Sequence, residues 1–156
     1  MDRGRIKADL RKIEEIKNLD LGPHRAVVFG GGLHAVGVNG LKEFKKRWGN
    51  LEDKKLAVFA VGASPATKGI VEEIARGNFT EDELGRLRLF YLRGGYDFRK
   101  LDFKNKILMQ LLQWKLTLKK KKTADEIGMW NAYRHPKDFA RREYIRELVD
   151  YVKGER

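Results

Sequence analysis

The segment from Ala26 to Gly40, which reads A-V-V-F-G-G-G-L-H-A-V-G-V-N-G, constrains the fold more than any other part of the chain. Its front half is a short apolar run with two β-branched valines that meets three glycines at residues 30–32. This pattern predicts a buried strand, Ala26–Phe29, that ends in a sharp turn. The back half leads through Asn39, a favourable N-cap residue, into a predicted helix, Asn39–Trp48, with one apolar stripe. A strand, a glycine loop and a helix in this order form the unit from which cofactor-binding α/β domains are built.

Two further strands are predicted: Leu56–Val61, which is a second continuous apolar run, and Leu87–Leu92. Continuous rather than alternating apolarity indicates strands that are covered on both faces, as in a parallel sheet between two helix layers. The first of these two strands exits into Gly62–Pro65, where Ser64 is expected to cap the next helix. The second exits into Gly94–Asp97. Because ligands bind beyond the carboxyl ends of parallel strands, these glycine-containing exits are expected to form one functional rim.

Capping signals and periodicity predict the remaining helices. The helix after the second strand is expected to end at Gly77 in a left-handed conformation, and Thr80 opens a capping box for a short helix. A long helix is predicted over about residues 102–118, with the lysine run 119–122 at its carboxyl end, where cations suit the helix dipole. A closing helix is predicted over about residues 138–152, and it is expected to end near Gly154.

Charge and cysteine content narrow the classes of function. The net charge of +12 implies a positive field that attracts phosphates, nucleic acid or an acidic membrane surface. The chain has no cysteine, which excludes disulfides and thiolate metal sites and suits a reducing cytoplasm. The charged start, Met1–Lys7, does not resemble a signal peptide, and no apolar run is long enough to span a bilayer. Because the chain has neither cysteine nor a recognisable signal peptide, a cytoplasmic location is expected. No metal site, serine triad, catalytic carboxylate pair or Walker loop is recognisable.

Three glycine-containing segments together resemble the flavodoxin-domain family that includes menaquinone-dependent protoporphyrinogen dehydrogenase. They read F-G-G-G-L-H-A-V-G-V-N-G, V-F-A-V-G-A-S-P and F-Y-L-R-G-G-Y-D-F, and an amphipathic helix follows the last. The resemblance covers about residues 25–152. It implies an α/β fold, a flavodoxin-like three-layer sandwich with a parallel sheet, formed as a single domain by residues 1–156. The helix and loop at about residues 97–136 match the family's characteristic insertion, which is implicated in membrane or quinone contact.

The resemblance implies FMN as the cofactor. In that family the loops after the third and fourth strands flank the isoalloxazine ring, and by position these loops are Gly31–Gly37 and Gly62–Pro65 here. The residues expected near the ring are Gly31, Gly32, Leu33, His34, Ala35, Gly37, Gly62, Ala63, Ser64 and Tyr96. Each also has a structural interpretation: the glycines as turn residues, His34 as a solvated loop residue, Ser64 as a helix cap and Tyr96 as a packing aromatic. No catalytic residue is assigned.

The N-terminal part departs from the family pattern. A flavodoxin begins with a strand and a Ser/Thr/Gly-rich loop that cradles the FMN phosphate at a helix N-terminus. Residues Met1–Leu21 contain no serine, no threonine and one glycine, Gly4. The fold is therefore expected to lack the N-terminal strand and phosphate-binding loop, as an N-terminally truncated flavodoxin. Either the natural start lies upstream of Met1, or the protein has lost its main phosphate site.

A missing first strand predicts an open sheet edge at Ala26–Phe29. The preceding segment, Ile6–Leu21, fits either a helix or a short edge strand near Ile6–Leu10 followed by a connection. Unless that segment pairs with the open edge, the edge is expected to seek a partner, because unpaired strand groups are a template for pairing. A homo-oligomer through residues 26–29 is the expected consequence.

Two classes of function remain. The first is an FMN-dependent redox protein, active in electron transfer or as a protoporphyrinogen dehydrogenase-like oxidoreductase, in which the flavin supplies the chemistry. The alternative is a non-catalytic flavodoxin-like module that has lost FMN and binds a partner, membrane surface or nucleic acid through its basic surface.

Residues 103–122 resemble a basic amphipathic helix at a membrane surface, although docking on their own domain fits equally. Nucleic acid is the least expected partner because no binding motif is present. The G-x-G-x-x-A match at Gly30–Ala35 lacks the acidic residue of a dinucleotide site.

Overall fold

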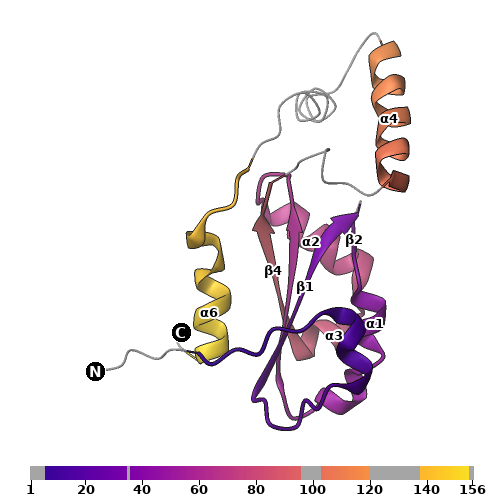
Figure 1. The fold of residues 1–156 in the computed structure, drawn as a ribbon. Helices are drawn as coiled ribbons and strands as arrows, with labels where there is room; N and C mark the ends of the chain where they lie inside the picture. The colour runs from indigo at the N-terminus through magenta and orange to yellow at the C-terminus, as the bar shows by residue number, and fades with distance from the viewer. Residues whose placement is uncertain (1–5, 35, 96–102, 120–137, 155–156) are drawn as a thin grey trace. The chain divides into compact units, whose positions relative to one another are not determined.

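The computed structural model describes residues 6–34, 36–95, 103–119 and 138–154. The chain divides into two compact units, one formed by residues 1–93 and 141–156 and the other by residues 94–140. The first unit is built on a four-stranded sheet in the order β2-β1-β3-β4 (Figure 1). The prediction of one domain over residues 1–156 with an insertion at about 97–136 stays a prediction.

The three long strands of the sheet run parallel, as predicted. They are β1 (Ala26–His34), β3 (Lys55–Gly62) and β4 (Leu87–Arg93). The sheet is not wholly parallel, because the two-residue strand β2 (Gly37–Val38) folds back on the end of β1 as an antiparallel hairpin. Its register pairs Leu33 with Val38 and His34 with Gly37. The sequence offered no signal for a strand this short.

Helices cover both faces of the sheet, which confirms the predicted α/β three-layer sandwich (Figure 1). One face carries α1 (Leu41–Lys45), α2 (Lys68–Asn78) and α3 (Glu81–Arg86), and the other carries α6 (Arg146–Lys153). The described residues also form the 3-10 helices η1 (Ile13–Asn18), η2 (Trp48–Leu51) and η4 (Arg142–Ile145). In the second unit the described helix is α4 (Phe103–Leu118), close to the predicted bounds.

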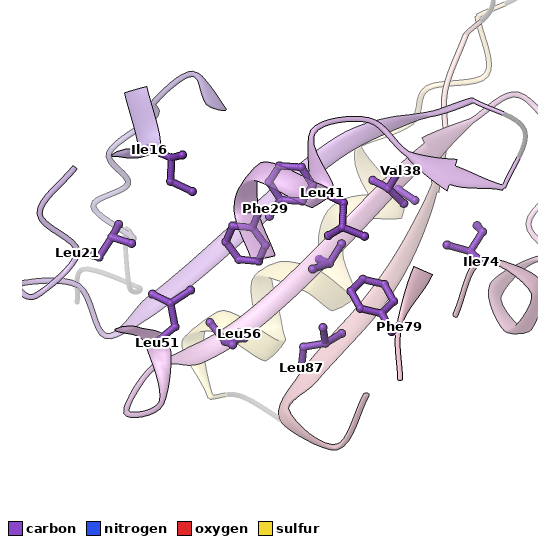
Figure 2. Packing of buried hydrophobic residues seen from close by; sticks show 13 residues of the cluster. Ile16, Leu21, Phe29, Val38, Leu41, Leu51, Leu56, Ile74, Phe79 and Leu87 are labelled. Atoms are coloured by element: carbon purple, nitrogen blue, oxygen red, sulfur yellow. The ribbon is translucent and has the colours of Figure 1, made fainter. Parts of the chain in front are cut away.

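The main core lies between the sheet and the α1–α3 layer (Figure 2). Phe44 of α1 is 1% exposed and stacks on Phe29 of β1 with ring centroids 4.9 Å apart. A smaller cluster on the opposite face joins Ala57 and Phe90 to Leu148 of α6. Burial of such apolar side chains is the main source of stability, at about 1.5–3 kcal/mol for each large one.

The glycines at residues 30–32 do not end β1, contrary to the prediction. The strand continues through them to His34. A Cβ on Gly30 would lie 2.0 Å from Cζ of Phe59, and one on Gly31 would lie 2.5 Å from the backbone oxygen of Asn39. Positive φ angles occur, among the described glycines, only at Gly40 and Gly154. Gly30 and Gly31 are therefore required by close packing within the sheet and not by a turn.

Three predicted helix ends are also corrected. The residue before α1 is Gly40, with a φ of 79°, and Asn39 instead donates its N–H to the end of β1. Thr67 rather than Ser64 caps α2, because its hydroxyl accepts from the N–H of the third helical residue at 3.4 Å. At the other end, α2 passes through Gly77 and stops one residue later. Gly77 faces Val36, whose Cγ2 would lie 3.2 Å from an added Cβ.

Two other predicted helix boundaries are confirmed, the start of α3 and the end of α6, and the predicted start of the closing helix is wrong. Thr80 forms the predicted capping box: its hydroxyl accepts from the N–H of Glu83 at 3.3 Å, and its N–H donates to the Glu83 carboxylate at 2.9 Å. Gly154 ends α6 in the left-handed conformation with a φ of 80°. The closing helix does not begin at Asp138, because α6 starts only after the 3-10 turn at Arg142.

The segment before η1 adopts neither structure expected near Ile6–Leu10. Residues 6–12 have no regular structure, and Leu10 is 95% exposed. Among the described residues, nothing from this segment pairs with β1. The proposed re-pairing of the open edge is therefore wrong for residues 6–10.

Candidate functional site

The carboxyl ends of the three parallel strands bring the predicted loops together. Gly62, at the end of β3, lies between Leu33 of β1 and Tyr91 of β4. A Cβ on Gly62 would be 2.8 Å from the Tyr91 hydroxyl oxygen and 3.0 Å from Cδ1 of Leu33. The chain is therefore so tightly packed at this point that only glycine fits without a shift. We call residues 30–34 and 62–65, which lie at this edge of the sheet, the rim.

Two side chains of β4 hold the loop after β3. The Tyr91 hydroxyl donates to the carbonyl of Ser64 at 2.8 Å, and Nε of Arg93 donates to the carbonyl of Ala63 at 3.2 Å. In a trans peptide the C=O and the following N–H point in opposite directions, so the N–H of Ser64 is directed away from Arg93. These contacts also explain why Ser64 does not cap α2, since they hold Ala63 and Ser64 against β4, three residues before the cap at Thr67.

Tyr91 acts as a hydrogen-bond donor throughout the physiological pH range. Burial raises the pKa of Tyr91 above its usual 10.0, and this effect outweighs the opposing influence of Arg93 and of the bond to Ser64. The phenol therefore stays protonated where the protein functions. Sequence reasoning missed both Tyr91 and Arg93; their alternation on one face of a strand that leads to the rim was the available signal.

Tyr91→Phe is expected to lower the free energy of unfolding by about 0.5–1.5 kcal/mol at pH 7, because it removes one hydrogen bond. The raised pKa favours the neutral form in the folded state. The contribution of protonated Tyr91 to the free energy of unfolding is therefore complete below pH 10, and it is lost as the pH rises through the pKa of the folded state. Urea unfolding at pH 7 and above pH 10 should show the difference between wild type and variant shrinking with pH. Tyr144→Phe, whose hydroxyl has no hydrogen bond in the described part of the chain, should change neither value; a constant Tyr91→Phe difference would contradict the assignment.

The loop of the β1–β2 hairpin is held by Asn78, the last residue of α2. The side-chain amide of Asn78 donates to the carbonyl of Val36 at 2.6 Å, and its oxygen accepts from the N–H of Val38 at 3.1 Å. Lys45 donates to the Asn78 carbonyl at 2.6 Å and to the Glu83 carboxylate at 2.7 Å. Burial raises the pKa of Glu83, but the bonds from Lys45 and Thr80 outweigh it, so the net pKa is lowered. Residues from three helices thus fix one wall of the rim.

The predicted cofactor residues are distributed unevenly over this rim. Four are exposed: Gly32, His34, Ala63 and Ser64. Four are half-buried: Gly31, Leu33, Gly37 and Gly62. The other two, Ala35 and Tyr96, lie outside the described residues. Each of the two loops therefore contributes exposed groups to the rim.

Other kinds of site find little support in the part of the chain that the structure describes. No group of three or more metal-ligating side chains is present there. None of the described helices has both the length and the apolarity needed to cross a bilayer. A cavity of about 470 Å³ lies along β4, and its lining includes Thr67, Lys68 and Arg88. Tyr91 and Arg93, which hold the loop after β3, also line it.

Comparison with known families agrees with this architecture. A family described as "Flavodoxin domain" matches residues 3–124. The match covers more than half of the chain, and the protein therefore belongs to the flavodoxin domain family, as the three glycine segments indicated. A search of curated proteins and a search of solved structures each found no match.

Proposed function

We propose that this protein is a flavodoxin-like redox protein that binds FMN at the rim. The observation that carries the proposal is the position of Gly62 against Leu33 and Tyr91. The carboxyl ends of β1 and β3 lie side by side there, at the edge of the parallel strands where α/β sheets bind ligands. Electron transfer and a protoporphyrinogen dehydrogenase-like oxidation are the two activities that we propose for a bound flavin.

The rim suits the ring of FMN better than its phosphate. Gly32 is exposed, and an added Cβ would meet only the side-chain amide of Asn39, at 3.9 Å. A flat ring can therefore approach the backbone at this position. The N–H of Ser64 offers a donor that is not directed toward β4. For the phosphate, the described residues before β1 contain no serine or threonine, so attraction would depend on the net positive charge. FMN, when bound, supplies one- and two-electron chemistry that no side chain here provides.

Titration of the purified chain with FMN and with riboflavin tests the proposal. We expect both to bind with quenching of flavin fluorescence and with similar affinity, because the rim contacts the ring. Gly32→Val should weaken binding at least about tenfold, because the side chain occupies the space of the ring while the fold has room for it. Gly49→Val is the matched control, since nothing lies within 4 Å of its added Cβ and it is remote from the rim. Unchanged binding by Gly32→Val, or no binding by the unmodified chain, would refute the proposed site.

A flavin-free binding module is the second candidate, and α4 favours it. Four apolar side chains at helical spacing are exposed on one face: Ile107, Leu111, Trp114 and Leu118. Trp114 is 67% exposed, and the neighbouring Lys115 and Lys119 are exposed as well. Exposed apolar side chains beside lysines support contact with an anionic membrane surface or with a quinone there, although α4 separates its apolar and polar side chains only weakly between its two faces. Failure to bind flavin, combined with salt-sensitive binding to vesicles that contain anionic lipid, would support this candidate.

A further inference from the structure

Two hydrogen bonds establish the direction in which the backbone of β1 faces. The carbonyl of Arg25 accepts from the N–H of Lys55 at 3.0 Å, on the side of β3. The carbonyl of Gly32 accepts from the N–H of Asn39 at 2.9 Å, on the opposite edge, where β2 lies. In a strand the N–H and C=O of one residue point to one side, and the side alternates from residue to residue. Even-numbered residues of β1 therefore face away from β3.

Three residues of β1 consequently present their backbone groups at the outer edge. Ala26, Val28 and Gly30 each turn one N–H and one C=O outward. In the described part of the first unit no strand pairs with this segment, because β2 covers only Leu33 and His34. The free edge, which we define as residues 26–30, thus carries three unpaired donors and three unpaired acceptors at regular spacing.

In the described part of the first unit, the free edge lacks three of the usual protections. Edge strands avoid association through charged side chains, proline or a bulge. Residues 26–32 contain no charge and no proline, and their register with β3 is continuous. The neighbouring face is also apolar: Val28 is 40% exposed, and the ring of Phe59 lies over Gly30. An apolar edge without these protections is a template for pairing with another strand.

We propose that the free edge pairs with the same edge of a second copy of this chain, as an antiparallel dimer about a twofold axis at Val28. In this register Val28 lies opposite the partner's Val28, and Ala26 lies opposite the partner's Gly30. All three N–H and all three C=O groups on each chain then find acceptors and donors. The strand that pairs here must also be short, because β2 blocks the edge beyond Gly30. The free edge of the second copy, residues 26–30, has the required length.

The charge of the protein gives this dimer a distinctive salt dependence. Each copy carries a net charge of +12, so two copies repel each other at long range, while the paired residues are uncharged. Salt screens the repulsion and should strengthen the dimer. Binding to an anionic surface or to nucleic acid would respond in the opposite direction.

A cysteine cross-link tests the register directly, and the cysteine-free chain needs no other change. Directly opposite residues of a hydrogen-bonded antiparallel pair have Cα atoms about 5.5 Å apart, which is within the disulfide range. Val28→Cys should therefore form a disulfide-linked dimer under mild oxidation. Ile145→Cys, at a position 44% exposed at the start of the α6 layer, is the matched control and should stay largely monomeric. Equal rates of cross-linking in the two variants would overturn the proposal.

Sedimentation equilibrium of the unmodified chain at low and high salt supplies the second test. We expect a dimer that tightens with salt. Val28→Lys should weaken it at least about tenfold, because like charges would lie directly opposite each other. Ile145→Lys adds the same charge elsewhere and should leave the dimer intact, and circular dichroism should show both variants folded. A monomer at all concentrations and salt levels would refute the dimer and leave the edge to an occupant other than a second copy.

Discussion

Replacing Phe44 by alanine is expected to lower the free energy of unfolding by about 3–5 kcal/mol. The side chain is 1% exposed and stacks on Phe29, and its edge meets Trp48 with ring centroids 6.0 Å apart. Truncation removes both aromatic contacts and leaves a cavity between α1 and β1 that a close-packed interior fills only partly. Urea denaturation at neutral pH, followed by circular dichroism, measures the loss.

An exposed aromatic provides the control for Phe44→Ala. Trp114 is 67% exposed on α4, so Trp114→Ala should change stability by no more than about 0.5 kcal/mol. Because a domain is stabilised by about 5–15 kcal/mol in total, Phe44→Ala can leave little folded protein. Phe44→Leu then serves as the milder variant, with an intermediate loss expected. Equal effects at Phe44 and Trp114 would contradict the central place of Phe44 in the core.

Replacing Gly31 by alanine is expected to cost about 1–3 kcal/mol, because it overpacks the β1–β2 hairpin. The added Cβ would lie 2.5 Å from the backbone oxygen of Asn39 and 2.8 Å from Cγ1 of Val38. A backbone carbonyl cannot turn aside as a flexible side chain can, so β2 must shift. The shift should also weaken the bond from Asn39 to Gly32 that closes the hairpin.

The same substitution in α3 should have the opposite sign. Gly85 has nothing within 4 Å of an added Cβ and lies inside a helix. Gly85→Ala is therefore expected to stabilise the protein by about 0.5–1 kcal/mol, because it lowers the entropy of the unfolded chain. Urea denaturation of both variants measures the contrast. A neutral Gly31→Ala would show that the hairpin adjusts without cost and that packing does not require this glycine.

Local patterns were sufficient for the parts of the fold whose cause is local. The continuous apolar run that became β3 predicted a strand covered on both faces, because every position of such a strand contacts a helix layer or the sheet. The capping box at Thr80 and the end of the closing helix near Gly154 depend only on residues within one turn of the helix. The flavodoxin architecture could be inferred from these elements and from the order of the glycine segments.

The rim could be predicted only in outline. Its two loops follow from the strand ends, but the groups that hold them are Tyr91, Arg93 and Asn78, which act on residues 27 to 42 positions away in sequence. The choice between Ser64 and Thr67 as the cap of α2 is of the same kind. Both are good N-cap residues, and the contacts that β4 makes with the loop decide between them.

The amino-acid sequence by itself determined the three long strands, their parallel arrangement and the charge-free edge at residues 26–30, because apolarity and charge are properties of consecutive residues. Only the tertiary structure decided the role of the glycines in β1. A glycine that turns the chain and a glycine that admits a neighbour are identical in sequence. The difference at Gly30 and Gly31 depends on Phe59 and Asn39, which reach β1 from another strand and from the far side of a hairpin.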